Sequence, residues 1–175
     1  EGIAVKQPGG LTLEICKEKL DDVVLVEESS IERSIQMMIE IEKSVVEGAG
    51  AAPLAALLDH PDRFKGKKVC LIISGGNIDT RLLAQVLMRG MARESRLVRV
   101  RIEIPDVPGA LSTISALIGE EDANIIEVYH QRHFYDVPAK QTDVDMVLEV
   151  RDTQHGQQVI DRLIKPNGSL ARILA

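Results

Sequence analysis

The sequence predicts a mixed α/β fold in two parts, because the pattern of apolar residues changes along its 175 residues. Residues 1–95 contain short, continuously apolar runs, which are typical of parallel strands covered on both faces. Residues 96–175 contain strands in which apolar and polar residues alternate, the pattern of a sheet with one core face. We therefore expect an α/β segment with a parallel sheet over 1–95, followed by a βαββαβ domain over 96–175.

Two strands are expected in the first part. Val23–Val26 and Val69–Ile73 are both short and continuously apolar. The second run leads into the glycine turn Ser74-Gly75-Gly76-Asn77 and then into a segment with helical spacing. A strand, a glycine turn and a helix in this order form a common ligand site of α/β proteins, because small groups bind at the start of the helix.

Helices are expected around these strands. Ser29 and Glu32 have the spacing of a capping box, which predicts that a helix begins there. Apolar residues then recur at steps of three and four from Ile31 to Val45, along one helix face. Further helices are predicted over residues 51–58, after a break at Gly48-Ala49-Gly50, and over residues 82–87.

The second part begins with clear alternation, since Val98, Val100, Ile102 and Ile104 are separated by mostly polar residues. The expected elements are a strand over 97–104, a turn over 105–109, a helix over 111–118, strands over 125–134 and 144–150 joined by a loop over 135–141, a helix over 159–164, and a strand over 170–174. The resulting order is βαββαβ.

Composition excludes some classes of function. A net charge of −6 argues against a nucleic-acid partner, because phosphates require a basic face. No apolar run approaches the length of a membrane span, and Cys16 and Cys70 are interpreted as buried thiols in a reducing compartment, so a cytoplasmic protein is expected. His130 and His133 would point to opposite faces of a regular strand, which favours a structural role over a metal site.

Three motifs occur in an order that resembles a known family. Gly2-Ile3-Ala4-Val5-Lys6, Glu47-Gly48-Ala49-Gly50 and Ser74-Gly75-Gly76-Asn77 are similar to the C-terminal half of the catalytic domain of fold-type II pyridoxal-phosphate enzymes. Pro105-Asp106-Val107-Pro108-Gly109-Ala110-Leu111 is similar to the first turn of an ACT domain. Together they resemble the medium-length threonine ammonia-lyases.

The resemblance implies pyridoxal 5'-phosphate as the cofactor and assigns residues to its site. Ser74 would hydrogen-bond the pyridine nitrogen, beside Gly75, while Glu47 and the backbone of Gly2 would line the pocket. The alternatives are that Ser74 caps the following helix and that Glu47 is a helix-end charge near Lys43. The family's Schiff-base lysine lies in a Ser-Phe-Lys motif that this sequence lacks, so no catalytic residue is assigned and the chain alone is expected to be inactive.

The resemblance also implies a regulatory role for the second part. In ACT domains the first loop and the helix start receive an amino-acid effector, which assigns Asp106, Val107, Gly109, Ala110 and Leu111 to an effector site for isoleucine or valine. Alternatively, these residues only form the turn. Pairing of edge strands predicts a homo-oligomer.

Other functions remain open at this level. Tyr129, Arg132 and Tyr135 are candidates for either an effector site or a dimer surface. The rival functions are a serine dehydratase or racemase specificity on the same scaffold, and a non-catalytic module that binds amino acids and dimerises.

Overall fold

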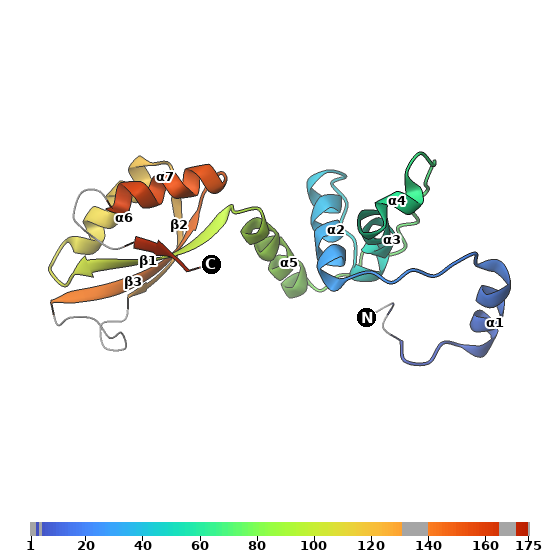
Figure 1. Ribbon diagram of the computed structural model, residues 1–175. Coiled ribbons are helices and arrows are strands. Elements are labelled where there is room, and N and C mark those ends of the chain that lie inside the picture. Colours follow the sequence, from blue (N-terminus) through green and yellow to red (C-terminus); the bar gives the residue numbers. More distant parts are fainter. Residues whose placement is uncertain (1–2, 4, 131–139, 165–170, 175) are drawn as a thin grey trace. The chain divides into compact units, whose positions relative to one another are not determined.

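The computed structural model describes residue 3 and residues 5–130, 140–164 and 171–174, which belong to two compact units, Glu1–Gly90 and Met91–Ala175 (Figure 1). The first unit is helical. Its helices are α1 (Gly10–Lys19), α2 (Glu28–Glu40), α3 (Gly48–Asp59), α4 (Pro61–Phe64) and α5 (Thr80–Arg93), the last of which continues into the second unit.

A small apolar core holds the first unit together. Helices α2 and α3 pack against each other, and α5 contributes Val86. The buried apolar residues are Ile31, Ile35, Val46, Ala51, Ala55 and Val86. The apolar face predicted for α2 is therefore confirmed up to Met38, which packs against this core, whereas Ile41 is exposed and Val45 follows the helix end.

The prediction of two strands in this unit is wrong. Residues 23–26 and 69–73 form neither helix nor strand, and they belong to no sheet in the described part of the chain. Their side chains are largely in solvent, with Leu25 exposed by 88% and Ile72 by 76%. A strand requires a neighbour that exchanges backbone hydrogen bonds with it, and neither segment has one among the described residues.

The predicted capping box is also wrong. Glu27 is the N-cap of α2, and no side-chain capping bond is formed by that residue. The cap comes from another helix, since the Asp59 carboxylate accepts hydrogen bonds from the Glu27 N–H and the Ser30 hydroxyl. The hydrogen bond from Ser30 contributes most, and together the two bonds hold the pKa of Asp59 below its ordinary value.

Sequence patterns also missed two features of this unit. Helix α1 was not predicted, and it has no buried residue, so it lacks the apolar face on which the prediction of a helix depends. Helix α3 begins at Gly48, so the expected glycine break lies inside its first turn.

Cys16 is half-buried and Cys70 exposed, which contradicts the prediction of buried thiols.

The second unit is a four-stranded antiparallel sheet with two helices, and the predicted βαββαβ order is confirmed. Its elements are β1 (Leu97–Pro105), α6 (Ala110–Glu120), β2 (Asn124–His130), β3 (Gln141–Glu149), α7 (Thr153–Ile164) and β4 (Ala171–Ile173). The strand order is β2-β3-β1-β4, which places the two longest strands at the centre. Both helices cover the same face of the sheet (Figure 1).

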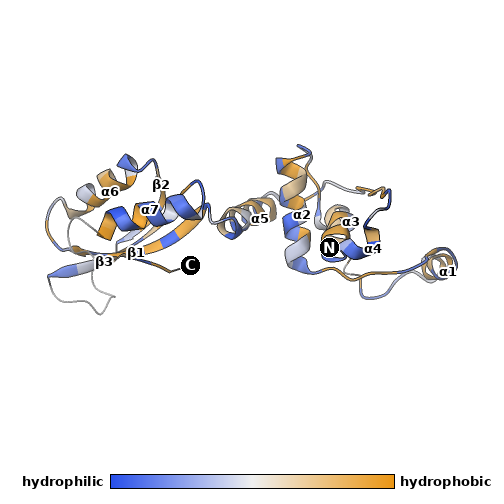
Figure 2. Ribbon diagram, turned by 45° about the horizontal axis from the view of Figure 1, so that its top comes forward, coloured by the Kyte–Doolittle hydropathy of each residue, from blue (hydrophilic) through white to orange (hydrophobic). Residues whose placement is uncertain are grey.

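The core of the second unit lies between the sheet and these helices. Val100, Ile102 and Ile118 are completely buried, as are Val144 and Met146 on the neighbouring strand. The alternation predicted for β1 is confirmed, and Figure 2 shows apolar residues on the sides of α6 and α7. The parts of the predicted elements at residues 131–139 and 170 lie outside the described residues.

In the described ranges, each helix is too short or too polar to cross a lipid bilayer.

Candidate functional site

The loop before α3 and the glycine turn at residues 74–76 meet in the first unit. The Glu47 N–H donates a hydrogen bond of 3.0 Å to the Gly75 carbonyl. A Cβ atom on Gly75 would lie 2.4 Å from Oε1 of Glu47, and one on Gly50 would lie 2.6 Å from the Gly75 oxygen. Two residues predicted from the sequence, Glu47 and Gly75, are thus adjacent, and Gly50 joins them because a side chain would not fit.

Ser74 lies beside this contact, with its side chain exposed. Within the described residues its hydroxyl has no hydrogen-bond partner, so it is available to a bound group. The alternative role of Ser74 as a helix cap is filled by Asp79, whose carboxylate accepts a 3.0 Å bond from the Leu82 N–H at the start of α5. Gly2 lies outside the described residues.

Ser74, Gly75, Gly50 and Glu47 form one wall with several polar groups. An available hydroxyl lies next to a backbone that approaches closely because Gly75 and Gly50 carry no side chain. The nearby Glu47 is half-buried. The wall can present a hydroxyl, a carboxylate and backbone polar groups.

The predicted effector loop forms a turn that starts α6. Gly109 is the N-cap, and its φ of +88° is the left-handed conformation that glycine adopts without strain. The Val107 N–H bonds to the Pro105 carbonyl at 2.9 Å, and the Ala110 N–H to the Val107 carbonyl at 3.3 Å. The Asp106 N–H donates a 3.0 Å hydrogen bond to the Lys140 carbonyl, and this bond ties the loop to the chain just before β3.

A cavity of about 390 Å³ opens at this loop. It is lined by Ile104, Pro105, Val107, Pro108, Gly109, Ala110, Thr113 and Ile114. Of the predicted effector residues, Val107, Gly109 and Ala110 line the cavity, whereas Asp106 and Leu111 do not. Thr113 was missed, although its position one helical turn after Gly109 could have indicated it.

The helix start gives this cavity a polar end. The Thr113 N–H bonds to the Gly109 carbonyl at 3.1 Å, but the N–H groups of Leu111 and Ser112 have no partner among the described residues. Free N–H groups and the dipole of the 11-residue α6 favour a bound carboxylate. The side chains of Ile104, Val107 and Ile114 make the rest of the lining largely apolar.

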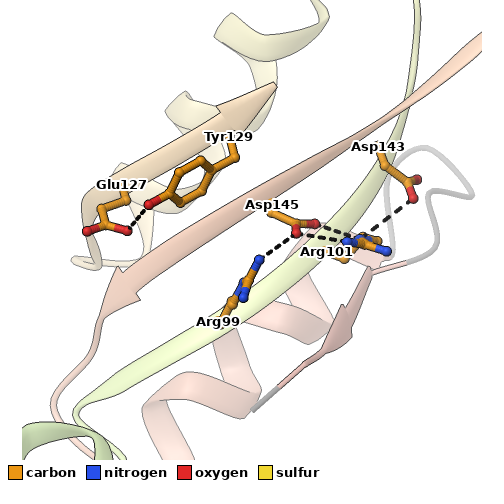
Figure 3. Close-up of polar contacts among 6 residues, drawn as sticks. All are labelled: Arg99, Arg101, Glu127, Tyr129, Asp143 and Asp145. Carbon is orange, nitrogen blue, oxygen red and sulfur yellow. Dashed lines mark hydrogen bonds and ion pairs between the residues drawn. The ribbon is translucent and has the colours of Figure 1, made fainter. Parts of the chain in front are cut away.

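The helix-free face of the same sheet carries a network of charges (Figure 3). The Asp145 side chain is only 1% exposed and accepts bonds of 2.6 and 2.8 Å from Arg101 and of 3.0 Å from Arg99. The pKa of Asp145 is lowered, mainly by the hydrogen bond from Arg101, although the burial of the carboxylate acts in the opposite direction. Asp143 lies 3.7 Å from Arg101. Alternation predicted a polar face here but not this pairing.

Tyr129 also lies on this face, exposed by 45%. Its hydroxyl donates a 2.6 Å hydrogen bond to Glu127, and this bond raises the pKa of Tyr129. Arg132 and Tyr135, the other two residues of that candidate surface, lie outside the described residues, as does His133. The described residues contain no cluster of side chains able to hold a metal ion.

Comparison with known proteins matches both units. Residues 1–75 match the family model described as pyridoxal-phosphate dependent enzyme, and residues 93–168 match the ACT domain model. L-threonine ammonia-lyase of Geobacter sulfurreducens is 43% identical over 164 residues, which cover 93% of this chain and 40% of that protein. L-threonine ammonia-lyase of Thermotoga maritima is 38% identical over 174 residues, covering 99% of this chain and 43% of that protein.

A more distant relative shares less of the chain. L-threonine dehydratase biosynthetic IlvA of Staphylococcus aureus is 34% identical over 123 residues, which are 70% of this chain and 29% of that protein. The chain spans about two fifths of the length of the two L-threonine ammonia-lyases. It is therefore a homologue of the C-terminal portion of threonine ammonia-lyases, and consists of a segment of a pyridoxal-phosphate-dependent enzyme followed by an ACT domain.

Proposed function

We propose that this chain is the C-terminal part of an enzyme that converts L-threonine to 2-oxobutanoate and ammonia, with pyridoxal phosphate as its cofactor. One observation carries the proposal. The similarity to two L-threonine ammonia-lyases runs through both units, over 93% and 99% of the chain. In this proposal the first unit, over residues 1–95, supplies one wall of the cofactor site, and the ACT domain over 96–175 regulates the enzyme in the cytoplasm.

The wall acts through Ser74, Gly75 and Glu47, with the backbone of Gly2 as a further lining group. Pyridoxal phosphate supplies an electron sink for loss of the α-proton and the β-hydroxyl. The Ser74 hydroxyl hydrogen-bonds the pyridine nitrogen and, being neutral, leaves that nitrogen largely unprotonated. Support comes from the exposed, unpartnered hydroxyl of Ser74 and from the close approach of backbone at Gly75.

Turnover by the intact protein from the source gene tests the reaction. We expect L-threonine to react faster than L-serine, without racemisation of either. Ser74→Ala should lower turnover of L-threonine roughly tenfold or more, since a hydrogen bond made to the cofactor is lost. Ser29→Ala, on the exposed start of α2, is the matched control and should leave turnover unchanged. A preference for L-serine would contradict the substrate assignment.

The chain alone should not form the covalent cofactor link, because none of its lysines has the Ser-Phe-Lys setting. Mixing the chain with pyridoxal phosphate, reducing with borohydride and measuring mass tests this. We expect no stoichiometric adduct. A stoichiometric adduct at one lysine would show that the chain carries its own tethering residue, and the proposal of an inactive part would fail.

The effector proposed for the ACT domain is isoleucine or valine. Its carboxylate would meet the free N–H groups of Leu111 and Ser112, while its branched side chain would fill the apolar lining of the loop cavity. Asp106 would help to hold the loop through its bond to the Lys140 carbonyl. Thermal unfolding with isoleucine, valine and threonine tests this, and an unchanged melting temperature with all three would contradict it.

A second candidate is a non-catalytic module that binds amino acids and self-associates. The observation that favours it is that the second unit has a hydrophobic core of its own. The edge strands β2 and β4 expose Val128 by 42% and Ile173 by 50%, as expected of strands that pair across a homo-oligomer contact. Light scattering distinguishes a dimer or tetramer from a monomer.

A further inference from the structure

The second unit has another polar pocket, far from the effector loop. It measures about 410 Å³ and is lined by Arg96, Asp122, Asn124, Glu149, Val150 and Arg151. It lies where β1 and β2 begin and β3 ends, because Glu149 pairs with both Leu97 and Asn124. The effector loop follows the other end of β1, about 27 Å along a nine-residue strand. The two pockets are therefore separate.

The charges around this end pocket come in opposite pairs. Arg96 and Arg151 supply two guanidinium groups, and Asp122 and Glu149 supply two carboxylates. The formal charge of the lining is therefore zero. A simple anion would approach two carboxylates, and a simple cation would approach two guanidinium groups, so neither matches the lining as well as a molecule that carries both charges.

The charged groups are available to a ligand. Arg151 is exposed, and its guanidinium has no partner among the described residues. Arg96 has its side chain 40% exposed, and Nη1 lies 3.9 Å from the nearest oxygen of Glu94, too far for a hydrogen bond. In the described part of the chain, the one hydrogen-bond contact of the Glu149 carboxylate is with the Asn124 amide, at 3.5 Å.

Hydrogen bonds hold the backbone on both sides of the pocket. The Val150 N–H bonds to the Arg96 carbonyl at 2.8 Å, and the Arg151 N–H to Nδ1 of His155 at 3.0 Å. His155 is buried, and its Nε2 lies 2.6 Å from the Glu121 carbonyl, beside Asp122. One histidine thus ties the Arg151 and Asp122 sides of the pocket together.

We propose that this end pocket binds a small polar α-amino acid in its zwitterionic form. The carboxylate is held by Arg96 and Arg151, since a guanidinium donates two parallel bonds to a carboxylate. The ammonium group lies between Asp122 and Glu149. Val150 is the one apolar residue of the lining, so the ligand has a short or polar side chain, unlike the branched effector proposed for the loop.

Backbone amide NMR of the whole chain tests the proposal, with L-serine as the probe. We expect saturable shifts at residues 122–124 and 149–151. Acetate and ethylammonium, which each carry one of the two charges, should bind at least tenfold more weakly, because each forms half of the charged bonds. Equal binding of acetate would point to a simple anion site and overturn the proposal, as would shifts confined to residues 107–111.

Matched variants separate the pocket from the rest of the domain. Arg151→Gln and Asp122→Asn should each weaken L-serine roughly tenfold to a hundredfold. Asparagine also tolerates the left-handed backbone of residue 122, whose φ is +59°. Arg172→Gln on β4 and Asp161→Asn on α7 change the same residue types outside the lining and should leave binding unchanged. If Arg151→Gln binds L-serine as tightly as the wild type does, the assignment of the end pocket is overturned. The response of the effector loop to isoleucine or valine is measured separately, from the amide shifts of residues 107–111.

Discussion

At the residue scale, Asp145 is the most buried carboxylate in the described part of the ACT domain. It lies on a sheet face that no helix covers, yet its side chain is 1% exposed because Arg99 and Arg101 lie over it. Replacing this carboxylate by a neutral amide removes the negative charge that both guanidinium groups bind, although Arg101 keeps its ion pair with Asp143. We expect Asp145→Asn to lower the free energy of unfolding at pH 7 by about 1–3 kcal/mol, as measured by chemical denaturation.

The same substitution predicts a pH dependence. The folded-state pKa of Asp145 is lowered, so its stabilisation is present above the unfolded pKa of about 3.9 and is lost as the pH falls through the folded value. The difference between wild type and Asp145→Asn should therefore shrink below about pH 4. Asp161→Asn, exposed on α7, is the control. A difference that stays constant down to pH 2 would contradict this reading.

Gly50 gives a second test at this scale. Alanine would normally stabilise a helix by about 1 kcal/mol over glycine, but a Cβ here would lie 2.6 Å from the Gly75 carbonyl oxygen. Since the obstacle is backbone, we expect Gly50→Ala to destabilise the first unit by about 1–3 kcal/mol. Gly48→Ala, where the new Cβ meets Ile31 at an ordinary 3.5 Å, is the matched control. Thermal unfolding that ranks the two variants the other way would contradict the packing described here.

The candidate residues were only partly predictable from the sequence. Glu47 and Gly75 came from the family motifs, and the structure places them in contact. The role of Asp59 could not be predicted, because its partner Glu27, the N-cap of α2, lies 32 residues earlier and meets it only in the folded chain. The burial of Asp145 was missed for the same reason, since the strand pattern shows a polar face but not which charges pair across it.

At the scale of elements, the turn before α6 depends on Gly109. Its φ of +88° would cost a residue with a Cβ about 1–2 kcal/mol, although no atom lies within 4 Å of the position that a Cβ would take. We expect Gly109→Ala to destabilise the domain by about that amount. Gly119→Ala, in the same helix and also in open space, should stabilise it by up to about 1 kcal/mol. Equal effects in denaturant titrations would contradict the strain argument.

The elements of the ACT domain were predictable, and those of the first unit were less so. Alternation in β1 and β3 predicts one apolar face on each strand, and both strands find their partners within the chain. The runs at 23–26 and 69–73 have the composition of buried strands but no strand neighbour among the described residues. A strand forms only where a second strand pairs with it, and the sequence of one segment does not show whether such a partner is present. The apolar runs alone were therefore not enough to predict strands.

At the scale of the molecule, the two units differ in how completely they bury their apolar residues. The ACT domain core is closed, whereas the first unit exposes Val23 by 71% and Leu25 by 88%. We expect residues 91–175 expressed alone to unfold cooperatively, and residues 1–90 alone to bind the dye ANS and unfold gradually. A sharp, dye-free transition of 1–90 would show that its apolar surface is covered in a way that the structure does not contain.

The measurement that tests the central claim most directly is the rate of 2-oxobutanoate formation by the intact protein, with isoleucine or valine added in increasing amounts. The proposal that the chain joins one wall of the cofactor site to an amino-acid-sensing domain predicts that L-threonine is consumed and that one of the two amino acids changes the rate in a saturable way. A rate of L-threonine turnover that neither isoleucine nor valine changes would contradict the proposed sensing role. No turnover of L-threonine at all would contradict the proposed enzymatic activity.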